Sequence, residues 1–565
     1  MISARRVLAG ICIAAVLSAG CGPKWFASDA DREVYRIVQK KSDQAVGAPE
    51  RSFSIETDRE VQALVEEAAR DEGGLDRPIG APGEGALPSP LPEAAPDAIV
   101  LTAADALRLA VRTSREYQSQ KEDVYLAALA LTFQRYLFRP HPFATGTVNL
   151  NNDTGARDRT YDGSADVGIS QQLADGATIV GSLGLTALKF LNKDFANTLD
   201  STFSWTLNQP LWRGAGRAVV QENLVQSERN ALYAVRTFAR YEQTFAVSIA
   251  SQYLRVLQQR TVVLNEWRNY RSLVEGRERA EWLAQAERLP QFQVDQARQD
   301  ELRAYDRWVA ARESYSNLLD ASKITLGVPV ETAVALDPAE LDRLTAEGLR
   351  PVGVDPAQAV ATALERRLDL ANTRDAVDDA QRKIRVAEDG LEGDVDLVAS
   401  IGYASDPLRS PQSARLAFHK GEYSIGFDLD MPVDRLQERN ALRETQIQRE
   451  RAERALVRLR DDVILQVRQA YRQVEQAQQS YEIQKVSVEL AQRRVESTEL
   501  LLQAGRASQR DVLEAQRALV DAQNALAQAL VDHTTAGLAL ERDIGTLVVD
   551  SEGQIHGWSL TPGGP

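Results

Sequence analysis

Few residues of this chain have the types and spacing that catalysis or metal binding requires. The 565 residues include four histidines and two cysteines, and no two histidines lie near each other. Metal-dependent enzymes usually hold their ligands at short, fixed spacings. Both cysteines, Cys12 and Cys21, lie at the N-terminus, so the body of the chain has no thiolate ligand and no disulfide. We therefore expect no catalytic residue, no cofactor and no metal site.

The charge balance argues against a nucleic-acid partner. The formal net charge is −15 and the isoelectric point is about 5.1. A nucleic-acid binder needs a basic face that neutralises phosphates. Charged residues make up 26% and hydrophobic residues 44%, which is typical of a chain that folds over most of its length. The acidic excess is explained by solubility alone.

The N-terminus predicts a secreted and lipid-anchored protein. Two arginines precede an apolar run over residues 7–17, and small residues follow, as in a secretory signal. The run is too short to span a bilayer. Its Ala-Gly-Cys ending resembles a bacterial lipobox with Cys21 as the acylated residue, although Ser18 stands where that motif usually has leucine. Gly22 after the cysteine favours outer-membrane sorting by the same resemblance. Ordinary signal cleavage beside an incidental cysteine is the alternative.

The body of the chain contains an internal repeat. Residues 101–117 and 355–370 both open with a helix-capping residue and continue as Ala/Leu-rich helices. Val294–Ala297 and Val512–Ala515 precede helices that end at glycines, and these segments differ by 218 positions throughout. A duplication of this kind sets the architecture. The expected segments are a signal peptide over 1–20, a lipid-anchored tail and linker over 21–98, a first repeat over 99–335, a linker over 336–354, a second repeat over 355–547 and a tail over 548–565.

Each repeat is expected to contain membrane strands. Apolar and polar residues alternate over 395–403, 422–431 and 202–208. The first two runs have about ten residues each, the length that a tilted strand needs to cross a bilayer. A partner strand in the first half lies at either 144–152 or 177–188. The chain has no apolar stretch of about 18 residues after the signal, so it would have to span a membrane as a closed β-barrel. A soluble β-sandwich would show the same alternation.

Long helices with heptad spacing follow the strands. Over 463–502 the seam positions recur at alternating intervals of four and three, and the pattern resumes over 512–529. The first half repeats this spacing over 246–274, with one break at Arg260. Helices of about 65 residues are near 100 Å long and exceed any single globular core. We expect two antiparallel coiled-coil hairpins per chain, with a free-standing dimeric rod as the alternative.

The junctions between strand and helix carry a family resemblance. Residues 208–217, NQPLWRGAGR, resemble the QPL-x-x-G signature by which TolC-like outer-membrane efflux proteins enter the long helix. Residues 431–433 look like its echo in the second half, and 503–547 are similar to the last hairpin of that family. The resemblance covers about 100–547. It depends mainly on the order in which the helices, strands and junction motifs follow one another. The matching junction residues are Pro210, Gly214, Gly216 and Pro432.

This resemblance implies a fold that is mainly α with membrane β. Coiled-coil hairpins would form a periplasmic α-barrel, and four strands per protomer would contribute to a trimeric 12-stranded β-barrel. The protein would be the outer-membrane exit duct of a tripartite efflux or type I secretion-type export system and a passive conduit. Its partners would be two further copies of itself, a periplasmic adaptor, an inner-membrane transporter and outer-membrane lipid.

The same resemblance assigns roles to residues at the helical turns. Asp511 and Glu514 match an acidic pair at the family's tunnel mouth, where three copies would ring the pore and concentrate cations. Asp511 would equally complement the dipole at a helix N-terminus. The residues that match adaptor-contacting tips are Leu289, Pro290, Gly505, Ala507 and Ser508, for which ordinary turn chemistry is the alternative.

Two other classes of protein remain open. A periplasmic adaptor lipoprotein also has coiled coil, but the two hairpins related by duplication argue against it. A surface-associated structural coiled coil would not need alternating strands beside the proline-containing junctions.

Overall fold

The computed structural model describes residues 22–46, 53–56, 89–91, 99–153, 158–190, 198–351, 353–405, 415–550 and 552–556. The predicted signal peptide over 1–20 and the predicted acylation site Cys21 lie outside the described residues. The chain divides into two units. Unit 1 comprises residues 1–53, 123–235 and 372–457, and unit 2 comprises 54–122, 236–371 and 458–565.

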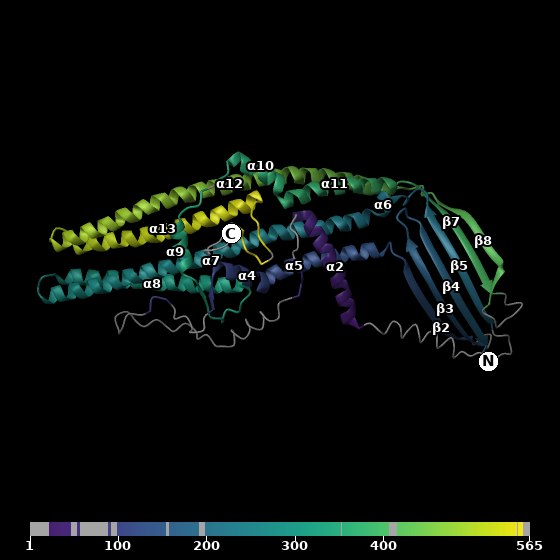
Figure 1. Ribbon diagram of the computed structural model, residues 1–565, viewed down its shortest axis with the longest axis horizontal. Coiled ribbons are helices and arrows are strands. Elements are labelled where there is room, and N and C mark those ends of the chain that lie inside the picture. The colour runs from purple at the N-terminus through teal and green to yellow at the C-terminus, as the bar shows by residue number, and fades with distance from the viewer. Residues whose placement is uncertain are drawn as a thin grey trace. The chain divides into compact units, whose positions relative to one another are not determined.

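Unit 1 contains one antiparallel sheet of six strands, which corrects the expectation of four (Figure 1). The first half supplies four strands instead of two, because both candidate segments are strands and the residues between them form a third. The strands follow one another in the sheet in chain order: β2 (His141–Asp153), β3 (Asp158–Gln172), β4 (Thr178–Phe190), β5 (Thr198–Pro210), β7 (Asp394–Ser405) and β8 (Leu416–Asp430).

The six strands share one apolar and one polar face. Residues in register across an antiparallel sheet lie on the same face. One such row joins Ala144, Val167, Leu183, Phe203 and Tyr403. The large residues on the apolar face are exposed: Val148, Leu150, Val167, Ile169, Leu183, Leu185, Trp205, Ile401, Tyr423, Ile425, Phe427 and Leu429.

The opposite face is lined by short polar side chains, some of which form hydrogen bonds between neighbouring strands. The hydroxyls of Thr147 and Ser164 share a hydrogen bond of 2.7 Å, as do those of Ser400 and Ser424. Its acidic residues are Asp162, Asp166, Asp200, Asp394, Asp396, Glu422, Asp428 and Asp430. In the paired rows of the described strands, no residue of this face is lysine or arginine.

Residues assigned from sequence to the N-terminal tail form a packed helix. Helix α2 (Pro23–Val46) buries Val34, Ile37 and Val38. The hydroxyl of Tyr125, on α5 (Arg115–Tyr136), donates a 2.8 Å hydrogen bond to Asp31. Part of the predicted tail therefore belongs to the core of unit 1.

Unit 2 is built on helical hairpins, as the heptads predict. The long helices α7 (Glu222–Gln285) and α12 (Leu436–Gln503) begin in unit 1 and continue into unit 2. They turn into α8 (Gln291–Leu326) and α13 (Gln509–Ile544) (Figure 1). The predicted seam is inside: Val467, Ala470, Val474, Ala477 and Tyr481 are buried in α12, and Val512, Ala515, Ala522 and Ala529 are buried in α13.

Shorter elements pack around these helices. Strands β1 (Ile99–Leu101) and β6 (Val334–Leu336) pair in parallel. The remaining helices are α4 (Ala103–Thr113), α9 (Ala339–Glu347), α10 (Pro356–Arg366), α11 (Leu368–Asp389), which begins in unit 2 and continues into unit 1, and α6 (Arg217–Val220), which belongs to unit 1. Among the described residues, no helix has the length and apolar character needed to cross a lipid bilayer.

Corresponding helices of the two halves have equal lengths. Helices α8 and α13 each have 36 residues, α4 and α10 each have 11, and α5 and α11 each have 22. Helices α8 and α13 also end alike, at Gly327 and Gly545, whose left-handed conformations differ by only a few degrees. Glycine adopts this conformation without the steric cost that a Cβ brings.

Candidate functional site

The first strand-to-helix junction is a tight, glycine-dependent crossing. Pro210 ends β5, and Gly214 and Gly216 have φ of 76° and 86°. The Gly214 amide donates a 2.9 Å hydrogen bond to the Asp389 carboxylate at the end of α11. The Gly216 amide donates to the Asp175 carbonyl at 3.0 Å. The predicted junction residues therefore join the sheet to its helices.

The turn between β3 and β4 packs directly on this junction. Gly176 in that turn has φ of 102°. A Cβ on Gly176 would lie 2.7 Å from the Gly214 carbonyl oxygen and 2.9 Å from Pro210 Cγ. The neighbouring Ala177 is buried. The turn that links the unpredicted strand β3 to β4 thus packs on the predicted junction residues.

The second junction is simpler. Pro432 follows β8, and its carbonyl accepts a 3.4 Å hydrogen bond from the Arg435 guanidinium. The Asp434 carboxylate accepts the Leu436 amide at 3.0 Å, which caps the start of α12.

A buried ionic cluster between α7 and α11 supports unit 1, and sequence reasoning missed it. Asp379 is 5% exposed and accepts hydrogen bonds from Tyr233 at 2.7 Å and Gln226 at 3.1 Å. The guanidiniums of Arg229 and Arg382 each approach it at 2.8 Å. Burial by itself raises the pKa of Asp379, but these hydrogen bonds and charges outweigh burial and lower the pKa below its ordinary value.

The predicted acidic pair lies at the α12–α13 turn, but its two members have different local roles. Asp511 forms a capping box with Ser508, whose hydroxyl and amide donate to the Asp511 carboxylate at 2.7 and 2.8 Å. Those bonds lower the pKa of Asp511. Glu514 forms a 3.2 Å ion pair with Arg494 on α12. Both carboxylates are exposed.

The tip residues lie in two comparable turns. Gly505 has φ of 69° at the α12–α13 turn, and Glu287 has φ of 58° at the corresponding place before α8. Leu289 packs against the small cluster of Ala280, Val294 and Ala297, while Pro290 is exposed and precedes α8. Ala507 is half-buried, and Ser508 is exposed.

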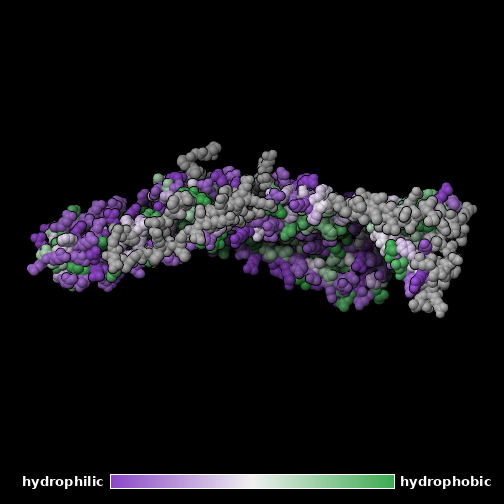
Figure 2. Space-filling view, turned by 90° about the horizontal axis from the view of Figure 1, so that it is seen from below, coloured by the Kyte–Doolittle hydropathy of each residue, from purple (hydrophilic) through white to green (hydrophobic). Residues whose placement is uncertain are grey.

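The first tip carries exposed aromatic residues that sequence reasoning missed. Trp282 is 72% exposed and Phe292 is 65% exposed. Most of the visible surface towards the hairpin tips is hydrophilic in Figure 2. Large apolar residues at such a position could have been found by searching the turn flanks for breaks in the heptad pattern.

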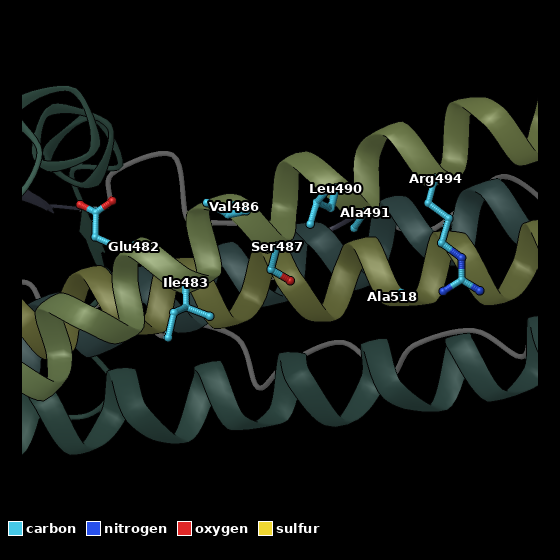
Figure 3. A pocket seen from close by; sticks show the side chains of 8 residues that line it. All are labelled: Glu482, Ile483, Val486, Ser487, Leu490, Ala491, Arg494 and Ala518. Carbon is cyan, nitrogen blue, oxygen red and sulfur yellow. The ribbon is translucent and has the colours of Figure 1, made fainter.

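A groove lies along α12 and reaches Ala518 of α13 (Figure 3). Its volume is about 690 Å³, and it is lined by Glu482, Ile483, Val486, Ser487, Leu490, Ala491, Arg494 and Ala518. The three large apolar residues among these follow helical spacing on one exposed face of α12.

The described residues contain no group of three or more His, Cys, Asp or Glu side chains that could hold a metal ion.

Comparisons with known proteins agree with this geometry. Residues 359–546 match the family model of the outer membrane efflux protein. No match was found among curated protein sequences. Among solved structures, the Campylobacter jejuni CmeC outer membrane channel is 12% identical with a TM-score of 0.59, over 81% of this chain and 87% of that one.

Two further outer-membrane proteins have the same fold. The Vibrio cholerae outer membrane protein VceC is 14% identical with a TM-score of 0.58, over 78% of this chain and 96% of its own. The open state of the Neisseria gonorrhoeae MtrE outer membrane channel is 12% identical with a TM-score of 0.54, over 78% and 88% of the two chains. Residues 359–546 therefore resemble the outer membrane efflux protein family, and the chain has the fold of these outer-membrane proteins.

Proposed function

We propose that this chain is the outer-membrane exit duct of a tripartite export system and works as a passive conduit. The observation that carries the proposal is a sheet with one apolar and one polar face whose strands β5 and β8 lead through short junctions into the long helices α7 and α12. The apolar face suits lipid and the polar face suits a water-filled lumen. Transport energy would come from the partner transporter.

The exposed apolar surfaces support a homotrimer. The sheet in isolation leaves its two outer strands without partners, which is a liability for a protein in lipid. The apolar stripe of Ile483, Val486 and Leu490 on α12 would pack against a helix of the neighbouring copy. The equal lengths of corresponding helices support an origin by internal duplication, which would let six similar hairpins form one tube.

The hairpin tips are the proposed contact with a periplasmic adaptor. Trp282 and Phe292 supply exposed apolar anchors beside the proposed contact residues Leu289 and Pro290. Gly505, Ala507 and Ser508 would present the second tip. Beyond the adaptor lies an inner-membrane transporter.

At the mouth, Asp511 and Glu514 would form acidic rings in the trimer. Glu514 is the cleaner probe, because Asp511 also caps its helix. Replacing Glu514 with glutamine removes charge and the Arg494 ion pair but leaves the capping box intact.

Lipid anchoring at Cys21 would add a second attachment to the outer membrane. A Cys21→Ser variant tests it by mass, because the mature wild-type protein would carry acyl chains that the variant lacks.

The proposed function is tested by fractionation and conductance of the full-length protein. We expect a trimer in the outer-membrane fraction whose mobility on a denaturing gel changes on heating, and stable ion-conducting steps in planar bilayers. Glu514→Gln should lower the preference for cations, while Glu496→Gln, an exposed carboxylate on the same hairpin, should leave it unchanged. A monomer in the inner-membrane fraction without conductance would contradict the proposal.

A further inference from the structure

We propose that strands β2 and β8 pair with each other between copies, so that three copies of the six-stranded sheet close a barrel of eighteen strands. This inference rests on the proposed trimeric duct and specifies which strands form the wall of its barrel. Strand β3, which the sequence analysis did not predict, and strand β4 would then both be part of the membrane wall.

The side-chain pattern places β3 and β4 in the wall. On β3, Tyr161, Val167 and Ile169 share the apolar face, and on β4, Leu183 and Leu185 continue it. Val167 is 60% exposed and Leu183 is 44% exposed. A soluble hairpin would hide such residues or make them polar. The same two strands place Asp162, Asp166 and Ser182 on the polar face, in register with the other strands.

The polar face is continuous through these strands. The Asp162 carboxylate accepts hydrogen bonds from Asn149 at 2.9 Å and Asn151 at 2.6 Å on β2. On the other side, the hydroxyls of Ser182 on β4 and Ser204 on β5 are 2.9 Å apart. The hairpin is therefore bonded to β2 and β5 through both its backbone and its lumen-facing side chains.

The two outer strands have the directions that closure requires. Strand β2 leads away from helix α5 and β8 leads back to helix α12, so they run in opposite directions. Six antiparallel strands are an even number, and the β8 edge of one copy meets the β2 edge of the next as an antiparallel pair. The edges are 13 and 15 residues long, enough to cross the bilayer at the usual tilt.

The base of the extra hairpin is fixed in place. The Gly176 turn contacts Gly214 and Pro210, and the Asp175 carbonyl accepts the Gly216 amide. These contacts hold β3 and β4 level with the strand ends where the helices begin. The barrel would have roughly 1.5 times the diameter of a 12-stranded one, because diameter grows almost linearly with strand number.

Disulfide trapping in the full-length protein tests the pairing. Val148→Cys on the apolar face of β2 is combined in turn with Tyr423→Cys, Ile425→Cys, Phe427→Cys and Leu429→Cys on the apolar face of β8. We expect at least one combination to yield covalent trimers on a non-reducing gel. Asn149→Cys with the same β8 variants is the matched control and should yield none, because its side chain lies on the opposite face. Single-cysteine variants measure the background from Cys12 and Cys21.

A second pair of cysteines, on β2 and β5, tests the alternative in which β3 and β4 are not part of the barrel. If β3 and β4 lay outside the barrel, β2 would pair with β5 of the same chain, and Val148→Cys with Leu199→Cys would form an internal disulfide. In the six-stranded sheet these strands are three spacings apart, about 14 Å, so no disulfide is expected.

The outcomes separate this inference from the proposed function. A conducting trimer without any β2–β8 disulfide, or with the internal Val148–Leu199 disulfide, overturns the eighteen-stranded wall and leaves the duct intact. Absence of any trimer overturns both. Cryo-electron microscopy of the wild-type trimer gives a variant-free check, with eighteen strands expected and twelve contradicting the inference.

Discussion

At the scale of single residues, unit 1 depends on one buried carboxylate. The Asp379 carboxylate forms ion pairs with two guanidiniums and accepts hydrogen bonds from a tyrosine hydroxyl and a glutamine amide. These partners lie on α7 and α11. Removing one partner from a buried ionic cluster leaves the other charges without compensation. The resulting loss of folding stability exceeds the net stabilisation that the intact cluster provides. This group therefore holds together the helices next to the sheet.

Asp379→Asn should destabilise the protein by about 3 kcal/mol, because it leaves Arg229 and Arg382 facing a neutral amide. Guanidinium titration followed by tryptophan fluorescence measures the change. Asp378→Asn is the control, since Asp378 is the exposed neighbour on the same helix. Equal unfolding midpoints for the two variants would show that the cluster carries no stability.

The same carboxylate gives a pH dependence. The pKa of Asp379 is lowered in the folded protein, so its contribution is fully present above the unfolded pKa of about 3.9 and is lost as pH falls through the folded value. The stability difference between wild type and Asp379→Asn should therefore be constant near neutral pH and shrink below about pH 4. Titrations at several pH values check this, and a difference that grows on acidification would contradict it.

Two corresponding turn residues make a matched pair. Glu287 and Gly505 both have positive φ, but only glycine adopts it freely. Glu287→Gly should stabilise its turn by about 1 kcal/mol, and Gly505→Ala should destabilise its turn by about as much. Hydrogen exchange of peptides that cover each turn measures both effects. Slower exchange in Gly505→Ala would contradict the steric argument.

At the scale of elements, the sheet is anchored through the β3–β4 turn. Gly176→Ala should cost about 2 kcal/mol, since a Cβ meets the Gly214 carbonyl at a backbone conformation that favours glycine. The heat resistance of the trimer on a gel reports the loss. Gly426→Ala on β8 is the control, because its added Cβ has open space within 4 Å and no positive φ.

The sequence predicted the helices better than the sheet. Heptads over 463–502 identified the buried seam over Val463–Tyr481, where α12 buries every fourth or third residue. Strand β3 was missed because Gly163 and Ala165 occupy apolar-face positions that larger residues mark in β8. Small residues carry almost no alternation signal, although the register shows that they belong to that face.

The ionic contacts could not be predicted because their partners are far apart in the chain. Asp379 and Arg229 are separated by about 150 residues, and Glu340, which caps α4 through the Ala103 amide, lies 237 residues from it. Periodicity reports which face of a helix is buried but not which charge lies opposite. The acidic pair at 511 and 514 was located by resemblance, and its capping box follows from local sequence alone.

At the scale of the whole molecule, the proposed lumen is acidic. The polar face carries carboxylates on β3, β5, β7 and β8, and no lysine or arginine in the paired rows of the described strands. We expect the channel to prefer potassium over chloride, measured as a reversal potential in a KCl gradient, with the preference weakening at high salt. Asp162→Asn with Asp166→Asn should reduce it, whereas anion preference in the wild type would contradict the assignment.

The equal lengths of α8 and α13 constrain how this protein can change. If both turns contact one partner, they must lie at the same level. Lengthening a single hairpin by a heptad on each arm would displace its turn by about 10 Å from the other turn. Only matched insertions in both halves would preserve the fit, so engineered spacers and tolerated natural indels should occur in pairs.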